Sequence, residues 1–208
     1  MEYYGGYTGA FSLSEKCHHP GLPVKVGPYQ IYLGANRSIS INTAAEMDYI
    51  CALNGSMIDD RQDEKFGRTF SYISCELPDR GGVPDVWPEF IQYIVGLLKA
   101  KKKILAYCIG GHGRTGTFGA SLISVLEPET PDPIDAIRER HCLKGVESRK
   151  QALAIFALRG KKLPPRYRAE FKEWKSSAVV YTPSTSVGGS SSPAQVNVVK
   201  PTDPFGSI

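Results

Sequence analysis

The sequence of 208 residues contains little cysteine, and its few cysteines are not paired. The five are scattered and odd in number, without the close spacing of a disulfide framework or a zinc ribbon. This usage favours a reducing compartment, so we expect an intracellular, cytoplasmic protein. Cys17, His18 and His19 are adjacent possible ligands, but no fourth ligand follows at a plausible spacing. We therefore expect neither a metal nor a cofactor.

Long apolar runs and a strong net charge are also absent. No run of apolar residues is long enough to cross a bilayer, and the N-terminus lacks the basic-then-apolar pattern of a secretory signal. We expect no membrane insertion. The net charge of +4 suits an anionic, phosphorylated substrate, but it is too weak to favour nucleic acid. Nothing in the sequence indicates an oligomeric state.

Three stretches of the chain differ in composition. Residues 1–24 are rich in Gly, Tyr, His and Pro without a clear period, which predicts an N-terminal extension. Residues 25–160 alternate apolar runs with amphipathic segments and predict one folded domain. Residues 161–208 are first basic and then rich in Ser, Pro and Gly, which predicts a C-terminal tail.

The alternation within the domain predicts an α/β fold with a central, mainly parallel sheet of about four or five strands flanked by helices. Strands are expected over 29–34, 49–53, 69–76 and 103–107. Helices are expected over 88–101, 115–126, 133–140 and 148–158. Thr43 with Glu46 predicts the capping box of a further short helix. A charged loop is expected over 59–68, and Asn54-Gly55 predicts a turn.

The chemistry concentrates in residues 108–116, Cys-Ile-Gly-Gly-His-Gly-Arg-Thr-Gly, which follow an apolar run. A strand that enters a glycine-rich turn and then a helix presents backbone N–H groups that fit a phosphate. Cys108 would lie at the floor of this loop as a nucleophile, facing the anion. The planar guanidinium of Arg114 would bind two phosphoryl oxygens. The expected phosphate-binding residues are Ile109, Gly110, Gly111, His112, Gly113 and Arg114.

Two residues of this segment, Thr115 and His112, each have two interpretations, and Gly116 has a packing role. Thr115 could donate a hydrogen bond to the sulfur and make it a better leaving group, or it is an ordinary residue of the first helical turn. His112 could add positive charge at the rim of the pocket, or it only shapes the entrance. Gly116 would let the new helix approach its neighbours closely.

The motif of Cys, five residues, Arg and Thr resembles the active-site loop of the protein-tyrosine and dual-specificity phosphatase superfamily, and the resemblance spans residues 28–160. The Thr-Gly that follows Arg114 looks most like the compact dual-specificity and lipid-phosphatase branches. The resemblance implies that 25–160 is a catalytic domain working through a phosphocysteine intermediate. One departure is Tyr107, which stands where the family usually has a histidine that helps hold the loop.

The resemblance also implies an aspartate general acid on an upstream loop. Asp79 directly follows the expected strand 69–76 and is close to two glycines that permit loop motion, so it fits this role. Asp85 directly precedes the Trp87-Pro88 helix start and is more simply a capping residue. Gln151 resembles the glutamine that orients the hydrolytic water in the family, but with Ser148 it also fits a capping box.

These residues predict a phosphoprotein phosphatase that hydrolyses phosphotyrosine and could also accept phosphoserine or phosphothreonine. One alternative is an RNA 5′-triphosphatase or phosphoinositide phosphatase that uses the same loop. Ile109 and His112 occupy places where phosphoinositide phosphatases often carry lysine. Another alternative is a pseudophosphatase that binds phosphate without releasing it. The motif alone does not determine the depth of the pocket or the physiological substrate.

Overall fold

The structure is a computed structural model that describes residues 17–55 and 71–171. Within these residues, five strands form one sheet in the order β1-β2-β5-β3-β4. The strands are β1 (Pro20–Val26), β2 (Tyr29–Ala35), β3 (Tyr49–Ala52), β4 (Ser71–Ser74) and β5 (Ile104–Cys108). Strand β1 runs antiparallel to β2, and the other neighbouring pairs are parallel. The predicted α/β fold with a mainly parallel sheet is confirmed.

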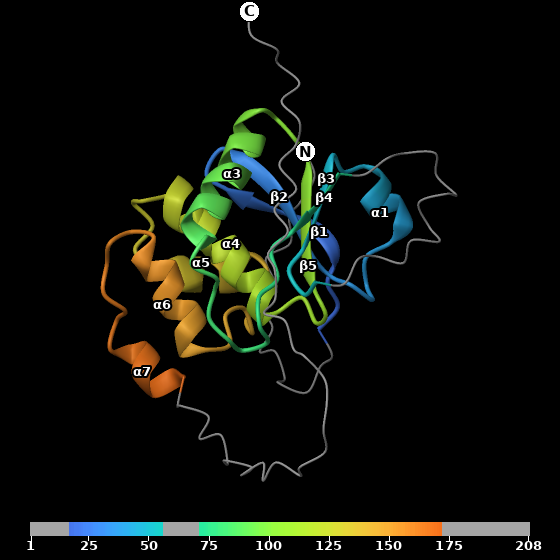
Figure 1. Cartoon of the computed structure of the whole chain (residues 1–208). Coiled ribbons are helices and arrows are strands. Elements are labelled where there is room, and N and C mark those ends of the chain that lie inside the picture. The colour runs from blue at the N-terminus through green and yellow to red at the C-terminus, as the bar shows by residue number, and fades with distance from the viewer. Residues whose placement is uncertain (1–16, 56–70, 172–208) are drawn as a thin grey trace, which may run out of the picture. The chain divides into compact units, whose positions relative to one another are not determined.

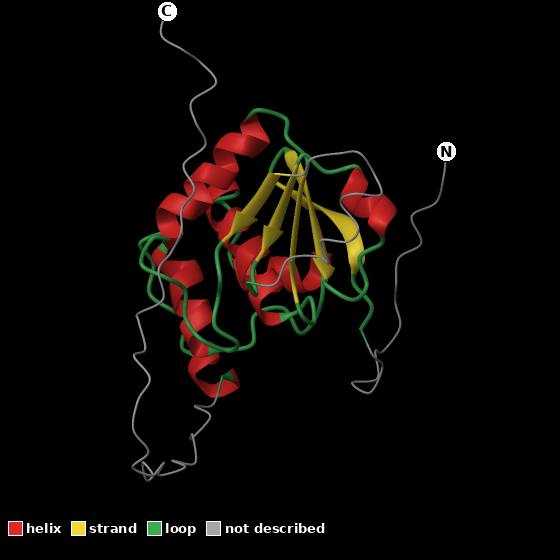
Figure 2. Cartoon of the chain, turned by 45° about the vertical axis from the view of Figure 1, so that its right-hand side comes forward, coloured by secondary structure: helices red, strands yellow, loops and turns green. Residues whose placement is uncertain are grey.

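Helices cover both faces of this sheet. The helices of the described segments are α1 (Ile41–Ala45), α3 (Trp87–Lys99), α4 (Gly113–Leu126), α5 (Pro133–Arg140), α6 (Arg149–Ala157) and α7 (Arg166–Glu170). Helix α1 lies on one face, and α3 to α6 lie on the other (Figures 1 and 2). None of these helices has the length and apolar character needed to cross a bilayer.

Two hydrophobic cores follow from the alternation of side chains along each strand. The larger core joins the sheet to α3–α6 and includes Ile31, Phe118 and Ile155, all fully buried. The smaller core lies under α1 and contains Leu105 and Tyr107 of the central strand. Tyr107 and Cys108 therefore face opposite sides of the sheet, and Tyr107 is a core residue.

The folded part begins earlier than expected. Strand β1 lies inside the stretch predicted to be an extension, and its Val24 and Val26 are buried in the larger core. Gly21 and Pro23 obscured this strand because both residue types are depleted in sheets. Proline is tolerated here because β1 is an edge strand, paired on one side only.

The folded part also continues beyond residue 160, where a tail was predicted. Helix α7 carries Tyr167, which is fully buried, and its ring stacks on Phe171 with centroids 5.6 Å apart. The Tyr167 hydroxyl donates a hydrogen bond of 2.8 Å to Asp132. Basic neighbours such as Arg166 made this segment resemble a solvated tail, although one aromatic side chain anchors it.

Two predicted caps are wrong. The N-cap of α1 is Ser40, whose hydroxyl oxygen accepts the Thr43 N–H at 3.0 Å, while Glu46 is at the C-terminal end of the helix. The N-cap position of α3 is Val86, without a side-chain cap, so Asp85 does not cap this helix. Burial of the next residue, Trp87, fixes the start of α3 instead. The predicted loop over 59–68 lies outside the described residues.

Candidate active site

Cys108 is the last residue of the central strand, where the carboxyl ends of β2, β3 and β5 meet. Ligands of parallel α/β sheets bind at this edge. The Asn36 N–H donates to the Cys108 carbonyl at 2.9 Å, which fixes the strand end from one side. The Cys108 sulfur is buried and accepts the Gly111 N–H at 3.2 Å. The sulfur thus lies against a backbone amide donor just before the N-terminus of α4.

Glycines let two other segments, the chain before β1 and the connection between α5 and α6, pack against the loop and the start of α4. Gly111 has a φ of 72°, and a Cβ there would lie 2.8 Å from the His19 ring. A Cβ on Gly113 would overlap a Glu147 carboxylate oxygen. A Cβ on Gly116 would lie 2.7 Å from the Gly145 Cα, which confirms the close approach of this helix to its neighbour. The loop is therefore held from outside as well as by its own turn.

Arg114 lies in the first turn of α4 and is only 8 % exposed. One guanidinium nitrogen lies 3.5 Å from a carboxylate oxygen of Asp79. The segment between β4 and Asp79 stays beside the end of β3, because the Leu77 N–H donates to the Leu53 carbonyl at 2.9 Å. The Asp79 side chain is 72 % exposed on a turn closed by the Gly81 N–H and the Pro78 carbonyl. The structure thus brings the expected acid to the expected phosphate-binding arginine.

Thr115 and Gln151 have well-defined partners. The Thr115 hydroxyl donates to the Gly34 carbonyl at 3.3 Å, which links α4 to β2, rather than to the Cys108 sulfur. The Gln151 side-chain oxygen accepts the Glu147 N–H at 2.8 Å. The side-chain nitrogen of Gln151 is buried and has no hydrogen-bond partner among the described residues. The described residues therefore leave its donor capacity unused.

Ser148 connects the loop that carries Asp79 to the helix that carries Gln151. Its hydroxyl donates to the Gly81 carbonyl at 3.2 Å and its oxygen accepts the Gln151 N–H at the same distance. The predicted capping role of Ser148 on α6 is confirmed. The hydroxyl that caps α6 therefore also links the start of this helix, where Gln151 lies, to the loop that carries Asp79.

Known structures share this architecture. The crystal structure of Tk-PTP in its active form matches 67 % of this chain and 97 % of its own, with 19 % identity and a TM-score of 0.51. A kinase-associated phosphatase with its catalytic cysteine replaced by serine matches 68 % of this chain and 95 % of its own, with 18 % identity and a TM-score of 0.54. The protein has the fold of the protein-tyrosine and dual-specificity phosphatases.

Sequence comparison identifies one distant relative. An uncharacterized protein of Methanocaldococcus jannaschii, MJ0215, is 39 % identical over 67 residues, which are 32 % of this chain. The matched segment spans 39 % of that relative's own length. No family model matches the sequence.

A histidine contacts the 108–116 loop from a distant position in the chain. The His141 Nε2 lies 2.8 Å from the Gly111 carbonyl, so its N–H donates to the loop. Burial is the main cause that lowers the pKa of His141, while this hydrogen bond opposes the shift. The sequence shows Tyr107 in place of the usual histidine but does not point to His141, because no local pattern links residues 107 and 141.

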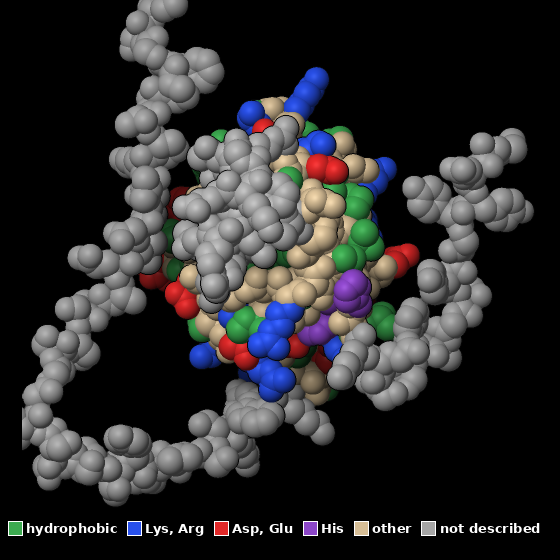
Figure 3. Space-filling model, turned by 90° about the vertical axis from the view of Figure 1, so that its right-hand side faces the viewer, with side chains coloured by type: hydrophobic (Ala, Val, Ile, Leu, Met, Phe, Trp, Pro, Cys, Tyr) green, Lys and Arg blue, Asp and Glu red, His purple; other side chains and the backbone are tan. Residues whose placement is uncertain are grey.

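The His112 ring contacts two side chains from other segments of the chain. Its ring is half-buried, and its Nδ1 lies 3.1 Å from His19 Nε2 and 3.3 Å from the Cys142 sulfur. Burial lowers the pKa of His112, partly offset by Glu147, and lowers the pKa of His19 to about 4. The His19 ring is therefore neutral at neutral pH. Figure 3 shows histidine side chains together on one face of the molecule.

Cys142 was not predicted as a site residue. It lies in the loop between α5 and α6, which Arg138 holds through hydrogen bonds to the Gly145 and Val146 carbonyls at 2.9 and 3.2 Å. This loop brings Cys142 to His112 and to the segment with Cys17 and His19, so that these four residues could hold a metal ion. The only sequence signal was the Cys17-His18-His19 run, because the other two ligands are far away along the chain.

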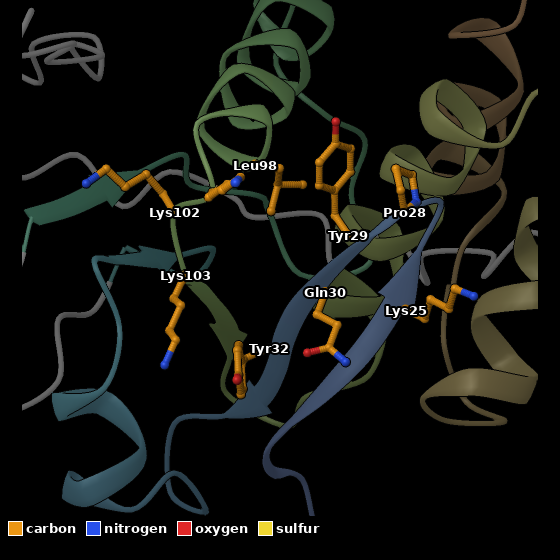
Figure 4. A pocket seen from close by; sticks show the side chains of 9 residues that line it. Lys25, Pro28, Tyr29, Gln30, Tyr32, Leu98, Lys102 and Lys103 are labelled. Carbon is orange, nitrogen blue, oxygen red and sulfur yellow. The ribbon is translucent and has the colours of Figure 1, made fainter.

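A hollow of about 560 Å³ lies at the other end of the central strand, away from Cys108 (Figure 4). Lys103, which directly precedes β5, is among its lining residues, as are Lys25, Tyr29 and Tyr32. Lys102 at its edge lies 3.7 Å from the Asp48 carboxylate. Because the hollow lies at the start of β5 and Cys108 lies at its end, the hollow is separate from the 108–116 loop.

Proposed function

We propose that the protein is a phosphoprotein phosphatase of the dual-specificity type, acting through a phosphocysteine intermediate. The observation that carries the proposal is the meeting of three groups at one sheet edge. They are the Cys108 sulfur under its glycine loop, the buried Arg114 and the Asp79 carboxylate at 3.5 Å from that arginine. An inert core cysteine needs none of these neighbours.

In the first step the Cys108 thiolate attacks phosphorus, forming an S–P bond as the P–O bond to the leaving group breaks. The guanidinium of Arg114 and the N–H groups of the loop hold the equatorial oxygens, whose charge persists in the transition state. Asp79 gives its proton to the leaving oxygen. Each group is a fixed donor or acceptor before the substrate arrives, except Asp79.

Asp79 is the movable group because its side chain is largely exposed while its partner Arg114 is buried. A bound phosphoryl group competes for the same guanidinium and releases the carboxylate, which takes up a proton from solvent before it acts as the acid. Gly81 and Gly82 follow Asp79 in the chain and permit the turn to adjust. Substrate binding is therefore coupled to freeing the acid from its resting ion pair.

In the second step a water molecule attacks phosphorus, the P–S bond breaks and the thiolate of Cys108 leaves. Asp79, now deprotonated, takes a proton from this water. Gln151 is suited to position the water, because its buried side-chain nitrogen has no hydrogen-bond partner among the described residues. Its oxygen is held by the Glu147 N–H, which keeps the amide in one orientation.

The test is hydrolysis by the full-length protein of an aryl phosphate, a phosphotyrosine peptide, a phosphothreonine peptide, a phosphoinositide and a 5′-triphosphate RNA. Cys108→Ser is expected to abolish turnover, while Cys75→Ser, a cysteine change outside residues 108–116, retains it. Turnover that survives in Cys108→Ser would overturn the mechanism. Preference for the RNA or the lipid would favour those activities, and binding without release would identify a pseudophosphatase.

A further inference from the structure

Four possible metal ligands converge behind the phosphate loop. The Cys17 and Cys142 sulfurs and one ring nitrogen each of His19 and His112 all lie within 4.8 Å of one another. They come from three separate segments: the chain before β1, the phosphate loop, and the loop after α5. We propose that Cys17, His19, His112 and Cys142 bind one zinc ion. This inference does not rest on the proposed phosphatase activity.

The separations between the ligand atoms fit a tetrahedral ion. Bond lengths of about 2.0–2.1 Å to nitrogen and about 2.3 Å to sulfur place neighbouring ligand atoms roughly 3.3–3.8 Å apart. The His19 and His112 nitrogens are 3.1 Å apart, and the His112 nitrogen lies 3.3 Å from the Cys142 sulfur. Small side-chain adjustments suffice to bring all four atoms to zinc. The nitrogens thus already face each other as ligands to one ion do.

The donor set selects the metal. Two thiolates and two imidazoles form the Cys2His2 set of structural zinc sites, whereas magnesium and calcium require oxygen ligands. Binding releases the two thiol protons, and the two thiolates neutralise the charge of the ion. The Lys144 N–H donates to the Cys142 sulfur at 3.4 Å, the kind of supporting bond that stabilises a metal-bound thiolate. Four protein ligands leave no open position, so the ion is structural.

The site would brace the phosphate loop from outside the substrate pocket. His112 lies between Gly111 and Gly113 of that loop, and the His19 ring already fills the space beside Gly111. His141, next to Cys142, packs on the His19 ring with centroids 4.8 Å apart. Zinc would therefore tie the loop to both the chain before β1 and the end of α5.

The experiment measures metal in the full-length protein, purified in the presence of a phosphine reductant without added chelator. Elemental analysis is expected to find one zinc ion per chain in the unchanged protein and in Cys75→Ser, the control. Cys17→Ser and Cys142→Ser are expected to lower zinc affinity at least tenfold. Because Cys17 is exposed and precedes β1, Cys17→Ser retains the fold, which circular dichroism verifies.

Cobalt provides a second readout that does not depend on expression conditions. Cobalt(II) added to the chelator-treated protein is expected to produce the visible bands of a tetrahedral site with thiolate charge transfer. Cys17→Ser should weaken the charge-transfer band. Folded unchanged protein that binds neither metal would overturn the proposal, as would equal metal binding by Cys17→Ser. A Cys17–Cys142 disulfide in the reduced preparation, seen by intact mass, would overturn it as well.

Discussion

The Asp79 carboxylate lies 3.5 Å from the Arg114 guanidinium, although one residue follows β4 at the sheet edge and the other begins helix α4 after the central strand. The parallel strands bring their carboxyl ends to one side, and this topology makes the pair possible. The cation expected to bind the substrate thus also holds the acid while the site is free.

Asp79→Asn is expected to lower kcat roughly a hundredfold to ten-thousandfold, because it removes the proton donor for the leaving oxygen. The alkaline limb of the pH–kcat profile should disappear with it. Asp85→Asn is the matched control, since Asp85 is exposed and lies on the same connection. Steady-state kinetics with an aryl phosphate checks both variants. Equal losses in the two would assign no special role to Asp79.

Gln151→Ala is expected to slow the second step more than the first, so that phosphocysteine accumulates. Rapid mixing should then show a burst of aryl alcohol before a slower steady state, and acid quench should trap the phosphoenzyme. Gln30→Ala, at an exposed position of β2, is the control. A uniform loss of rate without a burst would mean that Gln151 acts only through its hydrogen bond to Glu147.

Gly116→Ala is expected to destabilise the protein by about 1–3 kcal/mol, because its new methyl group would lie 2.7 Å from the Gly145 backbone. Gly96→Ala, in helix α3, meets nothing within 4 Å and should instead stabilise by about 0.5–1 kcal/mol. Urea unfolding measures both free energies. A neutral Gly116→Ala would show that the loop after α5 can move away from α4 without cost.

Stability is expected to fall in acid through Glu127. Its carboxylate accepts two hydrogen bonds from Arg140 and one from the Gly27 N–H, and the Arg140 bonds are the main cause that lowers its pKa from 4.5 to about 2. Because the folded value is the lower one, this contribution is complete above pH 4.5 and is lost as the pH falls toward 2. The shift corresponds to about 3 kcal/mol.

Chemical unfolding at pH 7, 4 and 2.5 tests this expectation in Glu127→Gln and in the exposed control Glu129→Gln. Glu127→Gln should be less stable at pH 7 and should lose less stability on acidification than the unchanged protein. The control should follow the unchanged protein. An identical acid dependence in all three would show that Glu127 does not drive the loss.

Local sequence was sufficient for much of the fold. The apolar run before Cys108 and the helices expected over 88–101 and 133–140 each depend on neighbours within one element. Each of these elements appears close to its predicted bounds. Strand β1 and helix α7 were missed because tertiary contacts hold them. Val24 and Tyr167 are buried by partners distant in the chain, and those partners cannot be identified from the local composition.

The sequence by itself determined the chemistry of the loop, because the thiol, the glycines and the arginine of 108–116 are contiguous. Only the tertiary structure decided which distant groups meet that loop. It placed Asp79 against Arg114, and it gathered Cys17, His19 and Cys142 around His112. Contacts within a few residues follow from backbone geometry, whereas contacts between segments require the sheet order and the packing of helices to be known.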